Sequence, residues 1–366
     1  MLTTEQQDFR VTLRRFLAEV SPESAVRAQM ATRDGFSPTV WKRMATELGL
    51  QALLVPEEYG GLGLGLVDLQ VVMEEMGRVL LCAPFLSSSV MATLAIRECA
   101  TAEAKGRLLP ALADGELTAA LAVSERDGRW SLDGLSTTAE PAGDGLYGLT
   151  GEKWFVIDGH TADVVLVAAR VDGGVGLFET SGGAEGLVRE PLTTLDETRK
   201  LARLELRGSP ARVLSATRDG VARVLQLVAG VVAAEQVGGA RRVLEMSVEY
   251  ATVREQFGKP IGSFQAIKHK CADMLMQIEA AEAAAYAVGR AADQGSDDVE
   301  LLASVAKSYC SDAYLFAAAE NIQIHGGIGF TWEHPAHLYY KRAKASQLLL
   351  GSPGEHREQI LSSLGI

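Results

Sequence analysis

The sequence predicts a mostly helical protein with a small β domain (α+β), in which a helical N-terminal domain precedes a central antiparallel sandwich or barrel and a C-terminal helical bundle. Residues 1–117 place apolar side chains at helical spacing, for example at Phe9 and Leu13. Residues 118–215 change to short apolar runs separated by Gly and Asp, which is typical of strands joined by hairpins. Residues 216–366 return to long helical patterns.

Local signals indicate where the first helices begin and end. The segment TTEQQ at residues 3–7 has the residue types of a capping box. Ser37 and Pro38 suit the N-cap and first turn of a later helix, and Gly49 suits its C-terminal cap. The stretch VPEEYGGLGLG, residues 55–65, predicts a loop. Its glycines lack the preceding strand and the spacing of a dinucleotide fingerprint, so we expect a plain surface loop.

The β domain and the bundle follow from different patterns. Six apolar runs predict strands: TAALAVS, LYGLTG, KWFVID, DVVLVAAR, GVGLFE and LARLEL. Residues 217–252 are apolar through most of their length, which predicts a helix buried on most sides and packed against another subunit as well. Three further helices are expected near residues 263–291, 298–324 and 335–349.

Composition excludes several classes of function. The chain is 47% apolar and 22% charged, as in an ordinary globular protein, and its net charge of -12 argues against nucleic acid as the main partner. The N-terminus lacks a signal peptide's apolar region and no uninterrupted apolar run approaches a membrane span, so we expect a cytoplasmic protein without a membrane partner. No C-x-x-C pair occurs, which predicts four reduced core cysteines: Cys82, Cys99, Cys271 and Cys310.

Metal and serine-hydrolase chemistry have no support in the sequence. His334 and His337 lack a second cluster at metal-ligand spacing, so a structural role is expected for them and no metal site is predicted. No Gly-x-Ser-x-Gly elbow is present, and serine hydrolysis is therefore not expected.

The segment Arg254–Gln265 carries residue types suited to a dinucleotide cofactor. Arg254 offers a planar fork of donors that matches a diphosphate, and Phe257 offers a flat face for stacking. Gln256 and Gln265 can bind polar edges. The alternative is a solvated loop that joins two bundle helices.

The segment Gln323–Phe330 is a second candidate. Gly326 and Gly327 follow a predicted helix, and adjacent glycines let a ligand approach the backbone closely. The alternative is a simple helix C-cap.

Five motifs together resemble the acyl-CoA dehydrogenase family, in the order that the family has them: VPEEYGGLGLG, AVSE, LTGEKWFVIDG, REQFGKPIGSFQ and QIHGGIGF. The resemblance covers essentially the whole chain. It implies an α domain, a small β domain and a four-helix bundle, assembled as a dimer or tetramer around FAD. In this family the adenosine and diphosphate end of FAD reaches the neighbouring subunit.

The resemblance also implies which residues hold FAD. Ser124 and Phe155 would lie beside the flavin ring of the chain's own FAD. The remaining cofactor-binding residues, most of which would serve the neighbour's FAD, are Arg254, Gln256, Phe257, Gln265, Gln323, Gly326, Gly327 and Ser352.

The family reaction is the α,β-dehydrogenation of an acyl thioester, in which a carboxylate removes the α-proton while hydride leaves Cβ for the flavin. Alignment with the family's two base positions places Leu350 at one and Val228 at the other, and neither can accept a proton. General-base catalysis contributes roughly 10²–10⁴-fold, so its loss would matter. A family Thr that binds the flavin ring aligns with Ile157. The chain therefore resembles a branch without the usual catalytic Glu.

Three readings follow from these departures. An active dehydrogenase would carry its base elsewhere, with Glu235, Glu333 and Glu125 as candidates that are more simply structural. A non-catalytic partner subunit would instead complete the FAD site of a sister dehydrogenase in a hetero-tetramer. A flavin monooxygenase of the same fold needs no Glu, but the intact Arg254-x-Gln-Phe argues against it. A non-enzymatic scaffold would bind no flavin at all.

The resemblance implies partners as well. These are an acyl-CoA-type substrate and an acceptor resembling electron-transfer flavoprotein.

Overall fold

The computed structural model describes residues 2–215 and 217–366. The chain forms two compact units. The first consists of Met1–Val26, Leu66–Leu81 and Ala229–Ile366, and the second of Arg27–Gly65 and Cys82–Val228. The helical N-terminal region thus contributes to both units.

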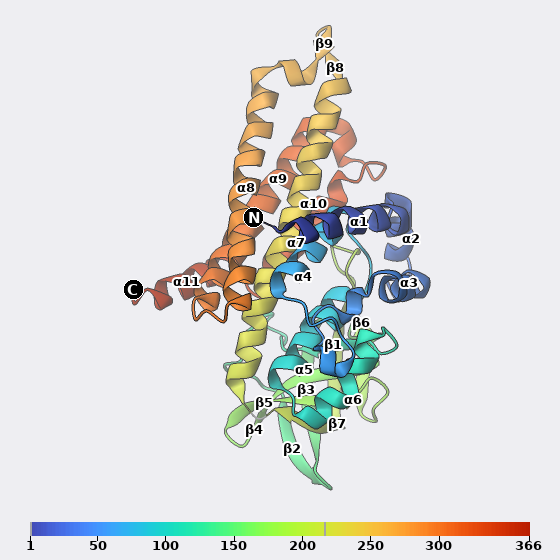
Figure 1. Ribbon diagram of the computed structural model, residues 1–366, viewed down its shortest axis with the longest axis vertical. Helices are drawn as coiled ribbons and strands as arrows, with labels where there is room; N and C mark the ends of the chain where they lie inside the picture. The colour runs from blue at the N-terminus through green and yellow to red at the C-terminus, as the bar shows by residue number, and fades with distance from the viewer. Residues whose placement is uncertain (1, 216) are drawn as a thin grey trace. The chain divides into compact units, whose positions relative to one another are not determined.

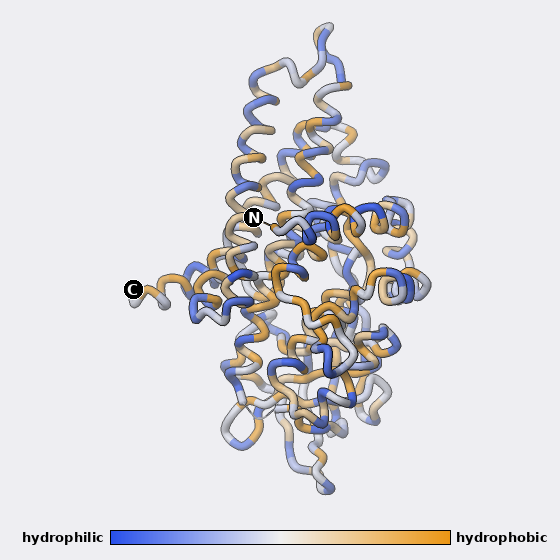
Figure 2. Tube along the Cα trace, viewed as in Figure 1, coloured by the Kyte–Doolittle hydropathy of each residue, from blue (hydrophilic) through white to orange (hydrophobic). Residues whose placement is uncertain are grey.

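Long helices build the first unit (Figure 1). The helix α9 packs against α8, α10 and α11, while Gln236 on α7 hydrogen-bonds Ser311 on α9. Hydrophilic and apolar residues alternate along the bundle helices with the helical turns (Figure 2). The predicted helical bundle is confirmed, and α11 is an additional helix. The helices that lie wholly or partly in this unit are α1 (Thr4–Val20), α2 (Glu23–Met30), α4 (Leu66–Arg78), α7 (Arg218–Val253), α8 (Gln265–Asp293), α9 (Val299–His325), α10 (Ala336–Leu348) and α11 (Pro353–Ser363). The end of α2 and the start of α7 belong to the second unit.

Two glycines let α4 and α7 touch backbone to backbone. A Cβ on Gly238 would lie 1.8 Å from the Glu74 carbonyl oxygen, and one on Gly77 would lie 2.1 Å from that of Glu235. Any side chain at either position would therefore separate the two helices. By length and composition α7 could cross a membrane, but 72% of its most apolar window is buried inside the protein, as in a core helix.

Short helices and their caps confirm the local signals. Thr3 and Gln6 form a capping box at the start of α1. Ser37 caps α3 (Pro38–Leu48), which ends at Gly49 with φ 62°. The second unit also contains α5 (Thr93–Cys99), α6 (Ala102–Ala113), the 3-10 turns η1 (Leu50–Ala52) and η2 (Glu57–Tyr59), and a π-helical segment, η3 (Phe85–Ala92), that no sequence signal predicted.

The strands of the second unit close on themselves. The pairing runs β4–β2–β3–β7–β5 and returns to β4, with β1 added on β4 and β6 on β7. Most pairs are antiparallel as predicted, but β1 runs parallel to β4, and a single parallel residue pair joins β2 to β4. The strands are β1 (Ala119–Ala122), β2 (Thr138–Gly143), β3 (Leu146–Ile157), β4 (Val164–Val171), β5 (Gly174–Ser181), β6 (Leu187–Pro191) and β7 (Leu201–Ser215).

Along these strands, alternate side chains point into the hydrophobic core of the second unit. Leu149, Val165, Val167, Phe178 and Leu204 are all at most 1% exposed. The runs LYGLTG and KWFVID belong to one strand, β3, which pairs with β7 through both runs, Glu152 included, and shifts register between Leu149 and Thr150 and between Lys153 and Val156.

The four cysteines are free thiols, as predicted, but only two belong to the core. Cys82 and Cys310 are buried, whereas Cys99 and Cys271 are half-buried. The prediction of four core cysteines was therefore wrong for two of them.

Candidate functional site

The segment Arg254–Gln265, hereafter the arm, joins α7 to α8 through a two-stranded hairpin of β8 (Glu255–Gln256) and β9 (Lys259–Pro260) (Figure 1). The turn residues Phe257 and Gly258 have φ values of 53° and 76°. Positive φ at both central residues is the geometry of a type I′ hairpin turn. The turn leaves Phe257 90% exposed, so within this chain its ring has almost no cover.

Arg254 lies at the base of the arm with its backbone fixed and its side chain free. Its N–H donates to the Tyr250 carbonyl at 2.9 Å, and its carbonyl accepts from Ile261 at 2.8 Å. Among the described residues its exposed guanidinium has no hydrogen-bond or ion-pair partner. Gln256 and Gln265 are exposed as well. The arm therefore offers donors and an aromatic face to a group outside this chain.

The Gly326–Gly327 turn follows α9. Gly326 has φ 61°, and a Cβ on either glycine would meet nothing within 4 Å. Gln323, one turn earlier, is exposed. The backbone here is open on its outer side, which suits close approach by a ligand.

A ring contact joins the two predicted segments. The Tyr250 ring stacks on the His325 ring with centroids 4.4 Å apart and planes at 28°. Tyr250 is the hydrogen-bond partner of Arg254, and His325 immediately precedes Gly326. The ends of α7 and α9 are thus held together, and with them the arm and the glycine turn.

In the second unit, Ser124 and Phe155 lie at the irregular part of β3. Ser124 is 1% exposed, and its carbonyl accepts from the Trp154 N–H at 2.9 Å. Phe155 has φ 57° and is half-buried. The register shift of β3 therefore brings this bulge against the segment after β1. Ile157, for which the resemblance predicts the position of a family Thr, is 2% exposed.

Glu125 follows Ser124 and is fully engaged. Its carboxylate accepts from the backbone and hydroxyl groups of Ser136 and Thr137 and from Lys153 Nζ at 3.0 Å. Burial alone would raise the pKa of Glu125, but Lys153 and these hydrogen bonds outweigh it and lower the pKa to about 2. Such a carboxylate stays ionised and is a poor general base.

The other carboxylates considered as bases are also unsuited. Glu235 is 5% exposed and accepts from Arg342 Nη1 at 2.6 Å, while Arg342 is itself 2% exposed. Glu333 is exposed to solvent. Val228 is completely buried among apolar side chains. The role of each residue in catalysis stays a prediction.

Leu350 lies in a tight turn between α10 and α11. It has φ 61° and is 6% exposed, and Gly351 has φ 103°. Ser352 caps α11: its hydroxyl accepts from the Glu355 N–H and donates to the Glu355 carboxylate at 2.8 Å. The Ser352 hydroxyl is therefore already used within the chain.

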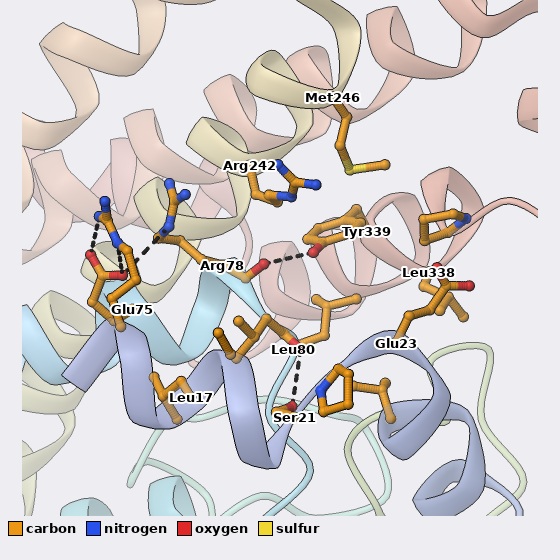
Figure 3. A pocket seen from close by; sticks show the side chains of 16 residues that line it. Leu17, Ser21, Glu23, Glu75, Arg78, Leu80, Arg242, Met246, Leu338 and Tyr339 are labelled. Carbon is orange, nitrogen blue, oxygen red and sulfur yellow. Dashed lines mark hydrogen bonds and ion pairs between the residues drawn. The ribbon is translucent and has the colours of Figure 1, made fainter. Parts of the chain in front are cut away.

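The first unit also contains a cleft of about 300 Å³ (Figure 3). Its guanidinium groups are all paired: Arg14 binds Glu75, Arg78 binds Glu245, and Arg242 lies 3.4 Å from Glu245. None of the site residues predicted from sequence lines it. The apolar part of its lining comprises Leu17, Val26, Leu80, Met246 and Leu338.

Two buried lysines were missed as site elements. Lys153 and Lys307 are both 0% exposed. The available signal was a lone lysine within an apolar run, as in ASVAKSYC around Lys307. A buried amine needs partners for its charge and donors, so such a lysine indicates a polar contact inside the fold.

The donor set fits the FAD that the resemblance implies. An unpaired guanidinium matches a diphosphate, an uncovered aromatic ring can stack, and glycine backbone open to the outside admits close approach. Arg254, Phe257 and Gly327 could hold one end of such a cofactor.

Comparison with known proteins agrees with the fold and the motifs. The model for the acyl-CoA dehydrogenase N-terminal domain matches residues 3–116, and that for the C-terminal domain matches residues 221–365. Acyl-CoA dehydrogenase IpdE2 of Mycobacterium tuberculosis is 36% identical over 354 residues, 96% of this chain and 94% of the relative.

Two solved structures are similar over nearly their whole length. The Tcur3481-Tcur3483 steroid ACAD variant is 30% identical with a TM-score of 0.90, covering 99% of this chain and 98% of that one. The ChsE4-ChsE5 complex from Mycobacterium tuberculosis is 26% identical with a TM-score of 0.92, covering 100% and 98%. The chain therefore belongs to the acyl-CoA dehydrogenase family, oxidoreductases that act on CH–CH bonds.

Proposed function

We propose that this chain binds FAD at a subunit interface and takes part in α,β-dehydrogenation of an acyl thioester as the subunit of a hetero-tetramer that lacks the usual catalytic Glu. The observation that carries the proposal is Leu350, an apolar residue held in a buried left-handed turn at the family's base position. A proton acceptor must lie within hydrogen-bond reach of the proton that it takes. Leu350 offers none, so a sister subunit would supply the base.

The arm supports the FAD assignment. Arg254 would donate to the diphosphate of the neighbour's FAD, with Gln256, Gln265 and Gln323 at its polar edges and Phe257 against a flat face. FAD, when bound, supplies the hydride acceptor of the reaction. Ser124 and Phe155 would border the ring of the chain's own cofactor and keep water from it.

The relatives support a hetero-oligomer. One similar structure is a complex of two differently named chains, ChsE4 and ChsE5, and another is named for two proteins, Tcur3481 and Tcur3483. An arm whose aromatic tip is 90% exposed also needs cover from another chain. We further infer an electron acceptor of the electron-transfer flavoprotein type. The four free thiols support a reducing, cytoplasmic location.

A displaced base on this chain is the less favoured alternative. Glu235 would have to leave Arg342, its partner at 2.6 Å, and breaking a buried ion pair is costly. Glu125, whose pKa is lowered to about 2, has too weak an affinity for a proton to serve as the base.

The test is to purify the chain alone and with a family member that carries the Glu, and to measure FAD per protomer and flavin bleaching by acyl-CoA. We expect turnover only with the sister chain. Full FAD loading with turnover by the chain alone would overturn the partner-subunit role. Absence of flavin in both preparations would overturn FAD binding as well.

A further inference from the structure

Lys307 lies inside the first unit beneath the turn that carries Leu350. It is on α9 and is 0% exposed, and it forms no ion pair with any described residue. Its Nζ donates to Ser311 Oγ at 3.1 Å and to the carbonyl oxygens of Gln347 and Gly351, each at 3.3 Å. Its three donors are thus matched by three neutral acceptors.

One of those carbonyls lies at the end of α10, and the other lies in the turn between α10 and α11. The Gln347 carbonyl is in the last turn of α10, where backbone carbonyls lack partners within the helix. The Gly351 carbonyl belongs to the second of two consecutive residues with positive φ, Leu350 and Gly351. From α11, His356 Nε2 contacts the Leu350 carbonyl at 3.0 Å. Side chains of α9 and α11 therefore hold the turn on both sides.

We propose that Lys307 is the positioning residue of the 347–352 turn, which it ties to α9 so that position 350 keeps its left-handed conformation. Leu350 at φ 61° is not held there by local preference alone, since a non-Gly residue in this region is uncommon. The tie supplies the missing constraint. The tie does not depend on the proposed function, but its relevance to catalysis, through position 350, rests on that function.

A lysine suits this place better than other residues of its length. Methionine would fill the same space but leave both carbonyls buried without donors. Arginine carries a planar fork that does not match acceptors arranged around a point. The compact ammonium group reaches Ser311 and the two carbonyls together.

Burial lowers the pKa of Lys307 to about 7, which gives the tie a distinctive signature. The ammonium form donates three hydrogen bonds, and the neutral amine donates two. The titratable neighbours do not change near neutral pH: the pKa of Cys310 is raised to about 12 and that of His356 is lowered to about 4. Asp312 and Glu355 are engaged by Arg357 and Ser352.

The experiment is hydrogen exchange on the full chain, comparing Lys307→Met with Cys310→Ala. Cys310 is buried on the same helix but contacts the Ala281 carbonyl instead of the turn, so it controls for general loosening of α9. We expect exchange of segment 348–356 to quicken by roughly tenfold or more in Lys307→Met alone, because unsatisfied buried carbonyls favour local opening.

The pH profile separates positioning from packing. In the wild-type protein, the exchange rate of this segment, corrected for the intrinsic rate, should rise as the pH increases through neutrality. In Lys307→Met the corrected rate should not change with pH. Equal exchange in Lys307→Met and Cys310→Ala, or a flat wild-type profile, would overturn the proposal. Neither result bears on whether the chain binds FAD, so failure here and failure of the proposed function are distinguishable.

Discussion

Lys153 Nζ lies 3.0 Å from both the Glu125 carboxylate and the Val123 carbonyl, so that one buried amine joins β3 to the segment after β1. The two residues flank Ser124 and the Trp154–Phe155 bulge, which carry the predicted flavin contacts. We expect Glu125→Gln to lower the free energy of unfolding by about 3 kcal/mol, because it leaves the Lys153 charge buried without compensation. Chemical denaturation would measure this, and the Glu125→Gln, Lys153→Met double variant should be more stable than the single. Additive losses would contradict the coupling.

Glu235 and Arg342 provide a second buried pair, in the first unit. Glu235→Gln should destabilise the protein by about 3–5 kcal/mol, since the buried Arg342 charge loses its carboxylate partner at 2.6 Å. Replacing both residues by methionine should recover much of that loss. If Glu235→Gln left the denaturation midpoint unchanged and instead abolished turnover of the chain alone, Glu235 would be acting as the displaced base.

Acid should weaken the protein through His356. Burial, and next the charge of Lys307, lower the pKa of this imidazole from 6.5 to about 4. Between those values the unfolded chain binds a proton that the folded protein does not, so the free energy of unfolding falls as pH drops from about 6.5 to about 4. The loss attributable to His356 is about 2–3 kcal/mol. Denaturation of His356→Gln across this range should show a shallower fall, and parallel curves would refute the assignment.

Arg254→Ala should weaken FAD binding by the assembled oligomer. A bidentate charge-assisted contact contributes about 1.5–3 kcal/mol, which corresponds to a roughly 10- to 100-fold rise in Kd. Arg254→Lys keeps the positive charge but lacks the planar fork of donors, so its Kd for FAD should lie between those of the wild-type protein and Arg254→Ala. Flavin fluorescence on titration would give the constants. Unchanged affinity in Arg254→Ala would remove the arm from the cofactor site.

A carboxylate at position 350 should give this chain a base. In an FAD-loaded assembly whose sister base has been removed, Leu350→Glu should bleach flavin with acyl-CoA at least about 10²-fold faster than Leu350→Gln. The glutamine variant controls for polarity and shape in the left-handed turn. Equal rates would mean that position 350 does not face the substrate.

Periodicity and caps predicted the elements that depend on local chemistry. The Thr3 box, the Ser37 cap and the left-handed Gly49 were readable because one or two residues determine them. Strands β2 (TAEPAG) and β6 (LVREP) were missed, because their charged and proline residues give no apolar run. They form because neighbouring strands supply hydrogen bonds, a contribution that sequence periodicity does not register.

In the candidate site too, features that depend on residue type were predicted and features that depend on tertiary packing were not. Residue types in the arm and the glycine turn predicted donors and an aromatic face, but not the Tyr250–His325 contact that brings both segments together, which depends on how α7 and α9 pack. The partners of Glu125 and Glu235 were invisible for the same reason, since Lys153 and Arg342 lie 28 and 107 residues away. The three-domain division at residues 117/118 and 215/216 stays a prediction.

The exposed arm has a consequence for handling the protein. Arg254 begins a hairpin whose residues are exposed among the described part of the chain, and trypsin cuts after arginine in accessible backbone; Lys259 is not a second site, because proline follows it. A lone chain should be cut there first. The cut breaks the peptide chain between α7 and α8, while the helices of the bundle stay packed together. A chain whose arm is covered by a neighbouring subunit should resist the same digestion. The amount of uncut chain on a gel would therefore measure assembly independently of flavin absorbance.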